Sequence, residues 1–139
     1  MAKLSMQTRV NVEPKSLWDV VGKFNALPEW HPMIQASKLE DGGRIRRLSI
    51  VGGGEIVERL EQIDAEDRMY RYSIISGPMP VMNYTATLRI KDDPESKGSI
   101  VEWTGEFEPK SGSGESDVMQ SMQSVYQAGL DNLRRMFGG

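Results

Sequence analysis

Arg47 and Glu58 are the residues of this chain whose types and spacing are best suited to chemistry. They lie on two strand-like segments, 44–51 and 55–63, that three consecutive glycines join. If the first two glycines form a tight hairpin turn, Arg47 faces Glu58 across the strands. A carboxylate on an apolar sheet face is costly to bury alone, so it needs such a donor. The pair either orients a ligand hydroxyl or carbonyl, moves a proton, or is only a cross-strand ion pair.

Tyrosine hydroxyls form a second candidate group. In the segment 81–91, Tyr84 shares one face with apolar residues, while the alternate positions are polar, and this pattern predicts an inward Tyr84. Its hydroxyl would then bind a carbonyl or donate a proton, or it belongs to a core tyrosine bonded to backbone. The same two interpretations apply to Tyr72 and Tyr126.

His31 is the only histidine, and it stands between Trp30 and Pro32 in a proline-rich turn. No second histidine and no cysteine is available to complete a zinc site or a catalytic triad, so we expect a structural role. We therefore expect no metal and no cofactor. The absence of cysteine also excludes disulfides and thiolate chemistry.

Hydrophobic periodicity predicts mostly strands, followed by one long amphipathic helix. The expected strands are 4–12, 34–39, 44–51, 55–63, 68–75, 81–91 and 99–108. The expected helices are 14–24, a turn plus a short helix at 25–32, and 116–137. This order predicts a single α+β domain, residues 1–139, in which a curved antiparallel sheet wraps the last helix. Such an arrangement tends to leave a cavity between the two layers.

The last helix carries a broad apolar face. That face contains Val118, Met122, Val125, Tyr126, Gly129, Leu130, Leu133 and Phe137. A glycine inside a helix costs about 1 kcal/mol against alanine, so Gly129 indicates either close approach of a strand or room for a ligand. The chain has nine methionines, which suit either a site for varied apolar shapes or plain core filling.

Composition excludes several classes of function. The chain has 139 residues, 38% hydrophobic and 27% charged, with a net charge of −3. That charge does not favour nucleic-acid binding, which needs a basic surface. No apolar run is long enough to span a membrane, and the N-terminus lacks a signal core, so we expect a cytoplasmic protein.

The segment 23–34, KFNALPEWHPMI, resembles the early helix-to-strand connection of the START-like (SRPBCC) superfamily. That superfamily includes the polyketide cyclase/dehydrase and lipid-transport family, the birch-pollen-allergen proteins and the plant abscisic acid receptors. Further matches in register are 58–64 (ERLEQID), Tyr72, Pro78, Pro80, Tyr84, 101–103 (VEW), Phe107, Gly129, Leu130 and Leu133. The resemblance implies a helix-grip fold: seven antiparallel strands, two short helices after the first strand, and a long C-terminal helix over an internal cavity.

The resemblance also implies ligand contacts. The matching positions are Gln35, Glu58, Tyr84, Glu102, Val125 and Gly129. Two loops, 51–54 and 76–81, would form the cavity mouth through Gly53, Gly54, Pro78, Met79 and Pro80. The sequence departs from the hormone receptors at Gln35, where they have a lysine, at the glycine triplet, which replaces their Ser-Gly-Leu-Pro gate, and at Met79-Pro80, which replaces their His-Arg latch. These differences argue against a receptor for that hormone.

The last strand presents a conflict. Hydrophobicity places Val101, Trp103 and Phe107 inward, whereas the resemblance makes Glu102 the inward residue. A β-bulge would reconcile the two expectations.

The leading hypothesis is a module that binds a small hydrophobic or aromatic molecule of lipid, polyketide or isoprenoid type, as a monomer or weak homodimer. Its expected ligand-binding residues are Gln35, Arg47, Glu58, Tyr72, Tyr84, Glu102, Met122, Val125, Tyr126 and Gly129. One alternative is a metal-free cyclase or aromatase in which Tyr84 and Glu58 or Arg47 move protons. A second alternative is a protein-interaction domain with a filled cavity.

Overall fold

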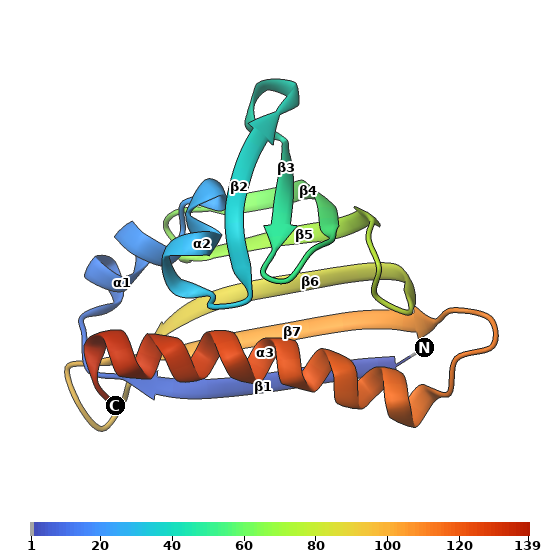
Figure 1. Cartoon of the computed structure of the whole chain (residues 1–139). Coiled ribbons are helices and arrows are strands. Elements are labelled where there is room, and N and C mark those ends of the chain that lie inside the picture. Colours follow the sequence, from blue (N-terminus) through green and yellow to red (C-terminus); the bar gives the residue numbers. More distant parts are fainter. Residues whose placement is uncertain (1) are drawn as a thin grey trace.

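The computed structural model describes residues 2–139 and shows a curved antiparallel sheet wrapped around a long helix (Figure 1). The strands are β1 (Ala2–Val10), β2 (Ile34–Glu40), β3 (Ile45–Ile50), β4 (Glu55–Asp64), β5 (Met69–Ser76), β6 (Val81–Asp92) and β7 (Ser99–Pro109). The helices are α1 (Pro14–Val21), α2 (Leu27–Trp30) and α3 (Glu115–Phe137), with single 3₁₀ turns η1 (Phe24–Ala26) and η2 (Asp41–Gly43). The element order expected from periodicity is confirmed.

The seven strands lie in the order β1-β7-β6-β5-β4-β3-β2. The first two strands of the chain therefore occupy opposite edges, and α1 and α2 make the connection between them. Figure 1 shows α3 running along β1 and β7, with β2 and β3 at the other end of the curved sheet. The concave face and α3 enclose the core, so side chains that point inward from β4, β5 and β6 lie beneath α3.

The amphipathic pattern of α3 explains its position. Its buried residues are Val118, Met122, Tyr126, Gly129, Leu130 and Leu133. Acidic residues in its first turn and Arg134 and Arg135 in its last turn complement the helix dipole. The first helix is shorter than expected and ends at Val21 rather than at residue 24. A Cβ at the following Gly22 would lie 2.5 Å from the Trp18 ring, so the turn there requires glycine.

The expected register of the β3–β4 hairpin is wrong by one residue. Arg46, not Arg47, is the partner of Glu58, and Ser49 pairs with Glu55. All three loop glycines have positive φ, from 91° to 113°, and form a wider loop than a two-residue turn. A slip of one residue exchanges the two faces of a strand, so Arg46 points inward and Arg47 outward.

The conflict in the last strand is resolved in favour of hydrophobicity. Trp103 is 4% exposed and points into the core. The ladders of β7 with β1 and with β6 are continuous on either side of Glu102, so no bulge turns this residue inward. The Glu102 side chain instead accepts a hydrogen bond from Lys91 Nζ at 3.0 Å. The expectation that Glu102 contacts a ligand inside the sheet is therefore wrong.

Candidate functional site

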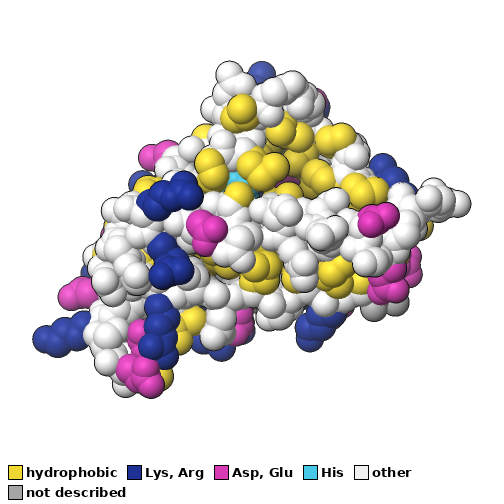
Figure 2. Space-filling model, turned by 60° about the horizontal axis from the view of Figure 1, so that its bottom comes forward, with side chains coloured by type: hydrophobic (Ala, Val, Ile, Leu, Met, Phe, Trp, Pro, Cys, Tyr) yellow, Lys and Arg dark blue, Asp and Glu magenta, His cyan; other side chains and the backbone are white. Residues whose placement is uncertain are grey.

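Two neighbouring spaces, which share lining residues, lie where α3, β2–β4 and the loop after β5 meet. The outer space is an open groove of about 440 Å³. Its lining residues are His31, Met33, Ile34, Ile50, Ile56, Pro78, Met79, Pro80, Ser121, Ser124 and Val125. Figure 2 shows hydrophobic side chains gathered around the histidine in a hollow on this face. This apolar groove is the mouth of the site.

The inner pocket is much smaller, with a volume of about 30 Å³. It is lined by Leu27, His31, Ile34, Arg46, Leu48, Ile56, Glu58, Tyr72, Ile74, Met79, Tyr84, Trp103, Met122 and Val125. A space of this size holds about one water molecule or one small polar group. The interior beneath α3 is thus largely filled by side chains, and the mouth groove supplies most of the free volume.

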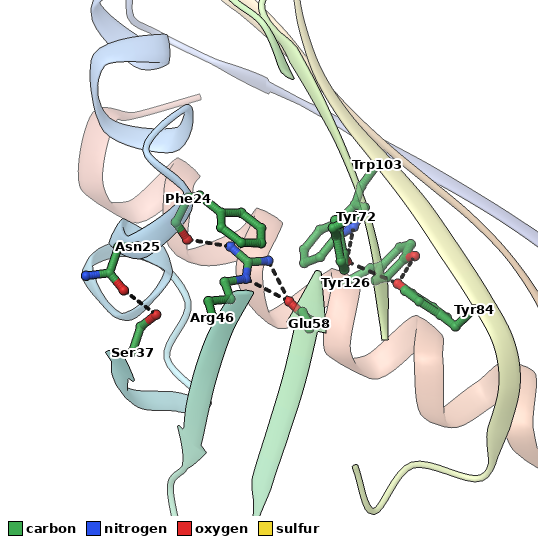
Figure 3. Close-up of polar contacts among 9 residues, drawn as sticks. All are labelled: Phe24, Asn25, Ser37, Arg46, Glu58, Tyr72, Tyr84, Trp103 and Tyr126. Carbon is green, nitrogen blue, oxygen red and sulfur yellow. Dashed lines mark hydrogen bonds and ion pairs between the residues drawn. The ribbon is translucent and has the colours of Figure 1, made fainter. Parts of the chain in front are cut away.

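Arg46 and Glu58 form a buried ion pair at the inner end of the site (Figure 3). Arg46 Nε and Nη2 contact Glu58 Oε1 at 2.8 and 2.7 Å. Arg46 Nη1 also donates to the carbonyl of Phe24, and the guanidinium lies 4.1 Å from the centre of the Phe24 ring. Burial raises the pKa of the Glu58 carboxyl, while Arg46 opposes that rise. The permanent positive charge of Arg46 thus makes the buried carboxylate tolerable.

Three tyrosine hydroxyls meet beside this pair (Figure 3). Tyr72 and Tyr84 are hydrogen-bonded at 3.2 Å, and Tyr84 is also hydrogen-bonded to Tyr126. Trp103 Nε1 donates to the Tyr72 hydroxyl at 3.1 Å. Burial raises the pKa of Tyr84 and of Tyr72 well above the ordinary value. These hydroxyls therefore remain protonated at neutral pH, where they can donate hydrogen bonds but cannot act as bases.

His31 connects α3 to the turn before β2. Its Nδ1 accepts a hydrogen bond from the backbone N–H of Met33 at 3.2 Å, so Nε2 carries the proton and donates to the carbonyl of Val125 at 2.8 Å. Burial lowers the pKa of His31, which favours the neutral ring. Gly129 makes this contact possible, because a Cβ there would lie 2.8 Å from His31 Cδ2 and 3.0 Å from Trp30. Gly129 therefore allows close approach of aromatic side chains, rather than the close approach of a strand that was one of the two expectations.

Replacing His31 with glutamine is expected to reduce the acid sensitivity of folding. Because the folded-state pKa lies below the ordinary value of 6.5, the unfolded chain binds a proton first as the pH falls. Stability therefore declines below that value, by up to about 1.4 kcal/mol per pH unit until the folded ring also titrates. Urea denaturation between about pH 7.5 and about pH 5.5 measures the slope. Equal slopes in the two proteins would assign the acid sensitivity to other groups.

The structure places only part of the expected site residues around these spaces. Glu58, Tyr72, Tyr84, Met122 and Val125 line the inner pocket. Tyr126 reaches the tyrosine cluster from α3. Aromatic rings pack directly against Gly129 and leave no space for a ligand there.

Two expected ligand contacts lie elsewhere. The Arg47 guanidinium pairs on the outer face with Glu40 at 2.9 Å and Glu55 at 2.6 Å. Gln35 is exposed at an irregularity of β2, whereas the adjacent Ile34 lines both the groove and the pocket. The prediction that Arg47 pairs with Glu58 is wrong, and so is the prediction that Gln35 faces the interior.

Only one of the two expected mouth loops lines the groove, because Gly53 and Gly54 are absent from its wall. Pro78, Met79 and Pro80 line the groove. A Cβ on Gly54 would lie 3.9 Å from the Pro78 ring, so the two loops are neighbours. Met79 also lines the inner pocket, so its flexible side chain stands between the two spaces.

Sequence reasoning missed Arg46 and did not place His31 in the wall of the site. For Arg46 a signal was present, because it alternates in phase with the apolar Leu48 and Ile50. For His31 no signal was present, because its partner is a backbone carbonyl 94 residues further along the chain.

A larger cleft of about 820 Å³ lies between the ends of β5 and β6. It is open and mainly polar, with Arg59, Glu61, Arg71 and Lys110 in its wall. An apolar ligand prefers a concave apolar surface, so the mouth groove is the better candidate despite its smaller volume. None of the helices within residues 2–139 is both long enough and apolar enough to cross a bilayer.

Comparison with known proteins now identifies the family. A family model described as "Polyketide cyclase / dehydrase and lipid transport" matches residues 1–138. The chain belongs to this family. Membership of the polyketide cyclase/dehydrase and lipid-transport family confirms the START-like resemblance seen in the sequence.

Relatives of this family member come from plants and bacteria. It is 33% identical to MLP-like protein 423 of Arabidopsis thaliana, over 76% of this chain and 77% of that protein. Its structure matches the protein XoxI of Bacillus cereus with a TM-score of 0.95 and 36% identity, covering 99% and 96% of the two chains. The structure of Ara h 8.0201 matches with a TM-score of 0.76 at 18% identity, covering 97% and 96%, and this match supports the helix-grip fold alone.

Proposed function

We propose that this member of the polyketide cyclase/dehydrase and lipid-transport family binds a small, mostly apolar molecule in the mouth groove. The observation that carries the proposal is an apolar groove of about 440 Å³ that shares five lining residues with an inner pocket containing Glu58 and Tyr84. Ligand pockets commonly have volumes of about 300–1,000 Å³, apolar walls and a few polar groups at one end. A lipid, polyketide or isoprenoid would fit this combination.

Affinity would come mainly from burial of the ligand's apolar part, at about 25 cal/mol per Å² before ordering costs are subtracted. The polar end of the ligand would approach the inner pocket past Met79. The thioether of methionine adapts to different apolar shapes, so a small shift of Met79 would admit ligands that the present pocket excludes. The printed description of the family, which includes lipid transport, supports the same proposal.

Filling the groove is expected to weaken ligand binding without altering the fold. Ser124 is an exposed residue of α3 that lines the groove, so Ser124→Trp would place an indole where the ligand lies. We expect the affinity for the fluorescent probe 1-anilinonaphthalene-8-sulfonate to fall at least about tenfold, or about 1.4 kcal/mol. Fluorescence titration measures the change.

Gln123→Trp is the matched control, because Gln123 is exposed on the same helix and is absent from the groove wall. It should bind the probe as the unchanged protein does. Equal affinity of Ser124→Trp and Gln123→Trp would place the apolar binding site elsewhere.

A cyclase activity is the second candidate, because Tyr84 brings a hydroxyl to the inner pocket beside Glu58. With its pKa raised well above the ordinary value, Tyr84 would act by donating a hydrogen bond or a proton to a substrate carbonyl, not as a base. The outward position of Arg47 removes it from this proposal, and Arg46 takes its place beside Glu58.

A further inference from the structure

The polar groups around the inner pocket include one donor hydrogen and one acceptor oxygen that have no hydrogen-bond partner in the protein. The three tyrosine hydroxyls carry one hydrogen each, and the cluster contains two hydroxyl–hydroxyl bonds. Each bond uses one hydrogen. Within residues 2–139, the three hydroxyls donate no further side-chain hydrogen bond, and in the bond with Trp103 the Tyr72 hydroxyl is the acceptor. One tyrosine hydrogen in the cluster therefore has no protein acceptor.

The acceptor is the second carboxylate oxygen of Glu58. Both contacts from Arg46 end on Oε1. Oε2 accepts no hydrogen bond from any side chain of the described residues, although Glu58 is only 5% exposed. Oε2 is not one of the fully buried side-chain atoms that lack a partner, so free space reaches it. Glu58 lines the inner pocket, so a group that enters that space can hydrogen-bond to Oε2.

Glu58, Tyr72 and Tyr84 line one space of about 30 Å³. When Tyr126 donates to Tyr84, the hydrogen left over belongs to Tyr72 or Tyr84 and is available to that space. The space has room for about one oxygen-bearing group. A hydroxyl suits both groups, because its hydrogen can be donated to Glu58 Oε2 while its oxygen accepts from a tyrosine. A ketone can only accept, and a carboxylate would place a second negative charge beside Glu58.

We infer that the inner pocket binds the hydroxyl group of an apolar alcohol, whose carbon skeleton lies in the mouth groove. This inference rests on the proposed function. It narrows the ligand class to molecules that carry a hydroxyl at one end of an apolar carbon skeleton, and it disfavours fatty acids and simple ketones. The Arg46–Glu58 pair then has a positioning role, because Arg46 holds Oε1 and directs Oε2 toward the ligand.

A matched pair of probes tests the inference on the unchanged protein. Decan-2-ol and decan-2-one share a carbon skeleton and differ only in whether the oxygen can donate. Displacement of 1-anilinonaphthalene-8-sulfonate gives their dissociation constants. We expect decan-2-ol to bind at least about tenfold more tightly than decan-2-one, since a hydrogen bond to a charged group is among the stronger ones. Decanoate is expected to bind more weakly than both.

The outcomes are distinct. Equal binding of alcohol and ketone, or tighter binding of the ketone or of decanoate, overturns the inference and leaves the proposed function standing. Failure of every probe to bind, including the fluorescent one, overturns both.

Glu58→Gln provides a second measurement. The amide can donate as well as accept, so the preference for the alcohol should fall to within about threefold, and decanoate should bind better. Glu55→Gln is the matched control, because Glu55 is exposed and pairs with Arg47 outside the site. It should keep the full preference. If Glu58→Gln does not fold, the comparison of probes on the unchanged protein still decides the question.

Discussion

Replacing Arg46 with alanine is expected to lower the free energy of unfolding by about 3–5 kcal/mol at neutral pH, because it leaves the Glu58 carboxylate buried without its counter-charge. The Phe24 carbonyl also loses its donor, and the Phe24 ring loses the guanidinium stacked on it. Urea denaturation measures the loss. The position next in sequence supplies the control, because Arg47 forms its ion pairs with Glu40 and Glu55 at the surface. Arg47→Ala should cost no more than about 1 kcal/mol.

The cost of Arg46→Ala is expected to depend on pH. Burial already raises the folded-state pKa of Glu58 above its unfolded value, and loss of Arg46 removes the charge that opposes this rise. The folded variant then binds a proton at a higher pH than the unfolded chain, so its penalty is complete above the raised pKa and shrinks as the pH falls toward the ordinary value. A double replacement, Arg46→Met with Glu58→Leu, should recover most of the stability. Equal costs for Arg46→Ala and Arg47→Ala would show that Glu58 does not need a buried partner.

Gly105→Ala is expected to destabilise the protein by about 1–3 kcal/mol through a clash with Tyr126. Gly105 lies on β7 between β1 and β6, and a Cβ there would overlap the Tyr126 hydroxyl oxygen and lie 3.5 Å from Tyr84. Because hydrogen-bonded strands flank β7 on both sides, the backbone cannot move away, and Tyr126 has to leave the cluster. Thermal or urea denaturation measures the effect.

A double-mutant cycle separates this clash from any general effect of removing a glycine. Tyr126→Phe alone should cost about 1 kcal/mol for the lost hydrogen bond. It also removes the oxygen that the new Cβ would meet, so the double variant should cost about 1 kcal/mol less than the sum of the single changes. Gly77→Ala is the control, because a Cβ there meets Ile56 at 3.4 Å or more, an ordinary contact. Strict additivity in the cycle would contradict the proposed clash.

Much of the architecture could be predicted from patterns along the chain. The alternation of polar and apolar residues placed Tyr84 and Trp103 inward, and both are buried. The apolar face of the last helix was assigned correctly from Val118 to Leu133, because helix periodicity is a local property. The mouth loop at Pro78–Pro80 was found through the resemblance to the family, not through periodicity.

The site was predicted less completely than the fold. Glu58 and Tyr84 were identified, but the partner of Glu58 was taken to be Arg47 because a two-residue glycine turn was assumed. The leading hypothesis expected an internal cavity, whereas the pocket left beneath α3 has a volume of only about 30 Å³. Side-chain volume against a curved sheet is a property of the assembled layers, so neither composition nor periodicity reveals it.

By itself, the sequence predicted which segments form strands and helices, the apolar face of the last helix, and the inward direction of Tyr84 and Trp103. Those properties depend on residues close together in the chain. Only the tertiary structure decided that Arg46 faces Glu58, that His31 donates to Val125 and that the mouth groove is larger than the inner pocket. Each of these depends on contacts between segments that are distant in the chain. One additional residue in a hairpin loop, for example, shifts the strand register and changes which side chains meet.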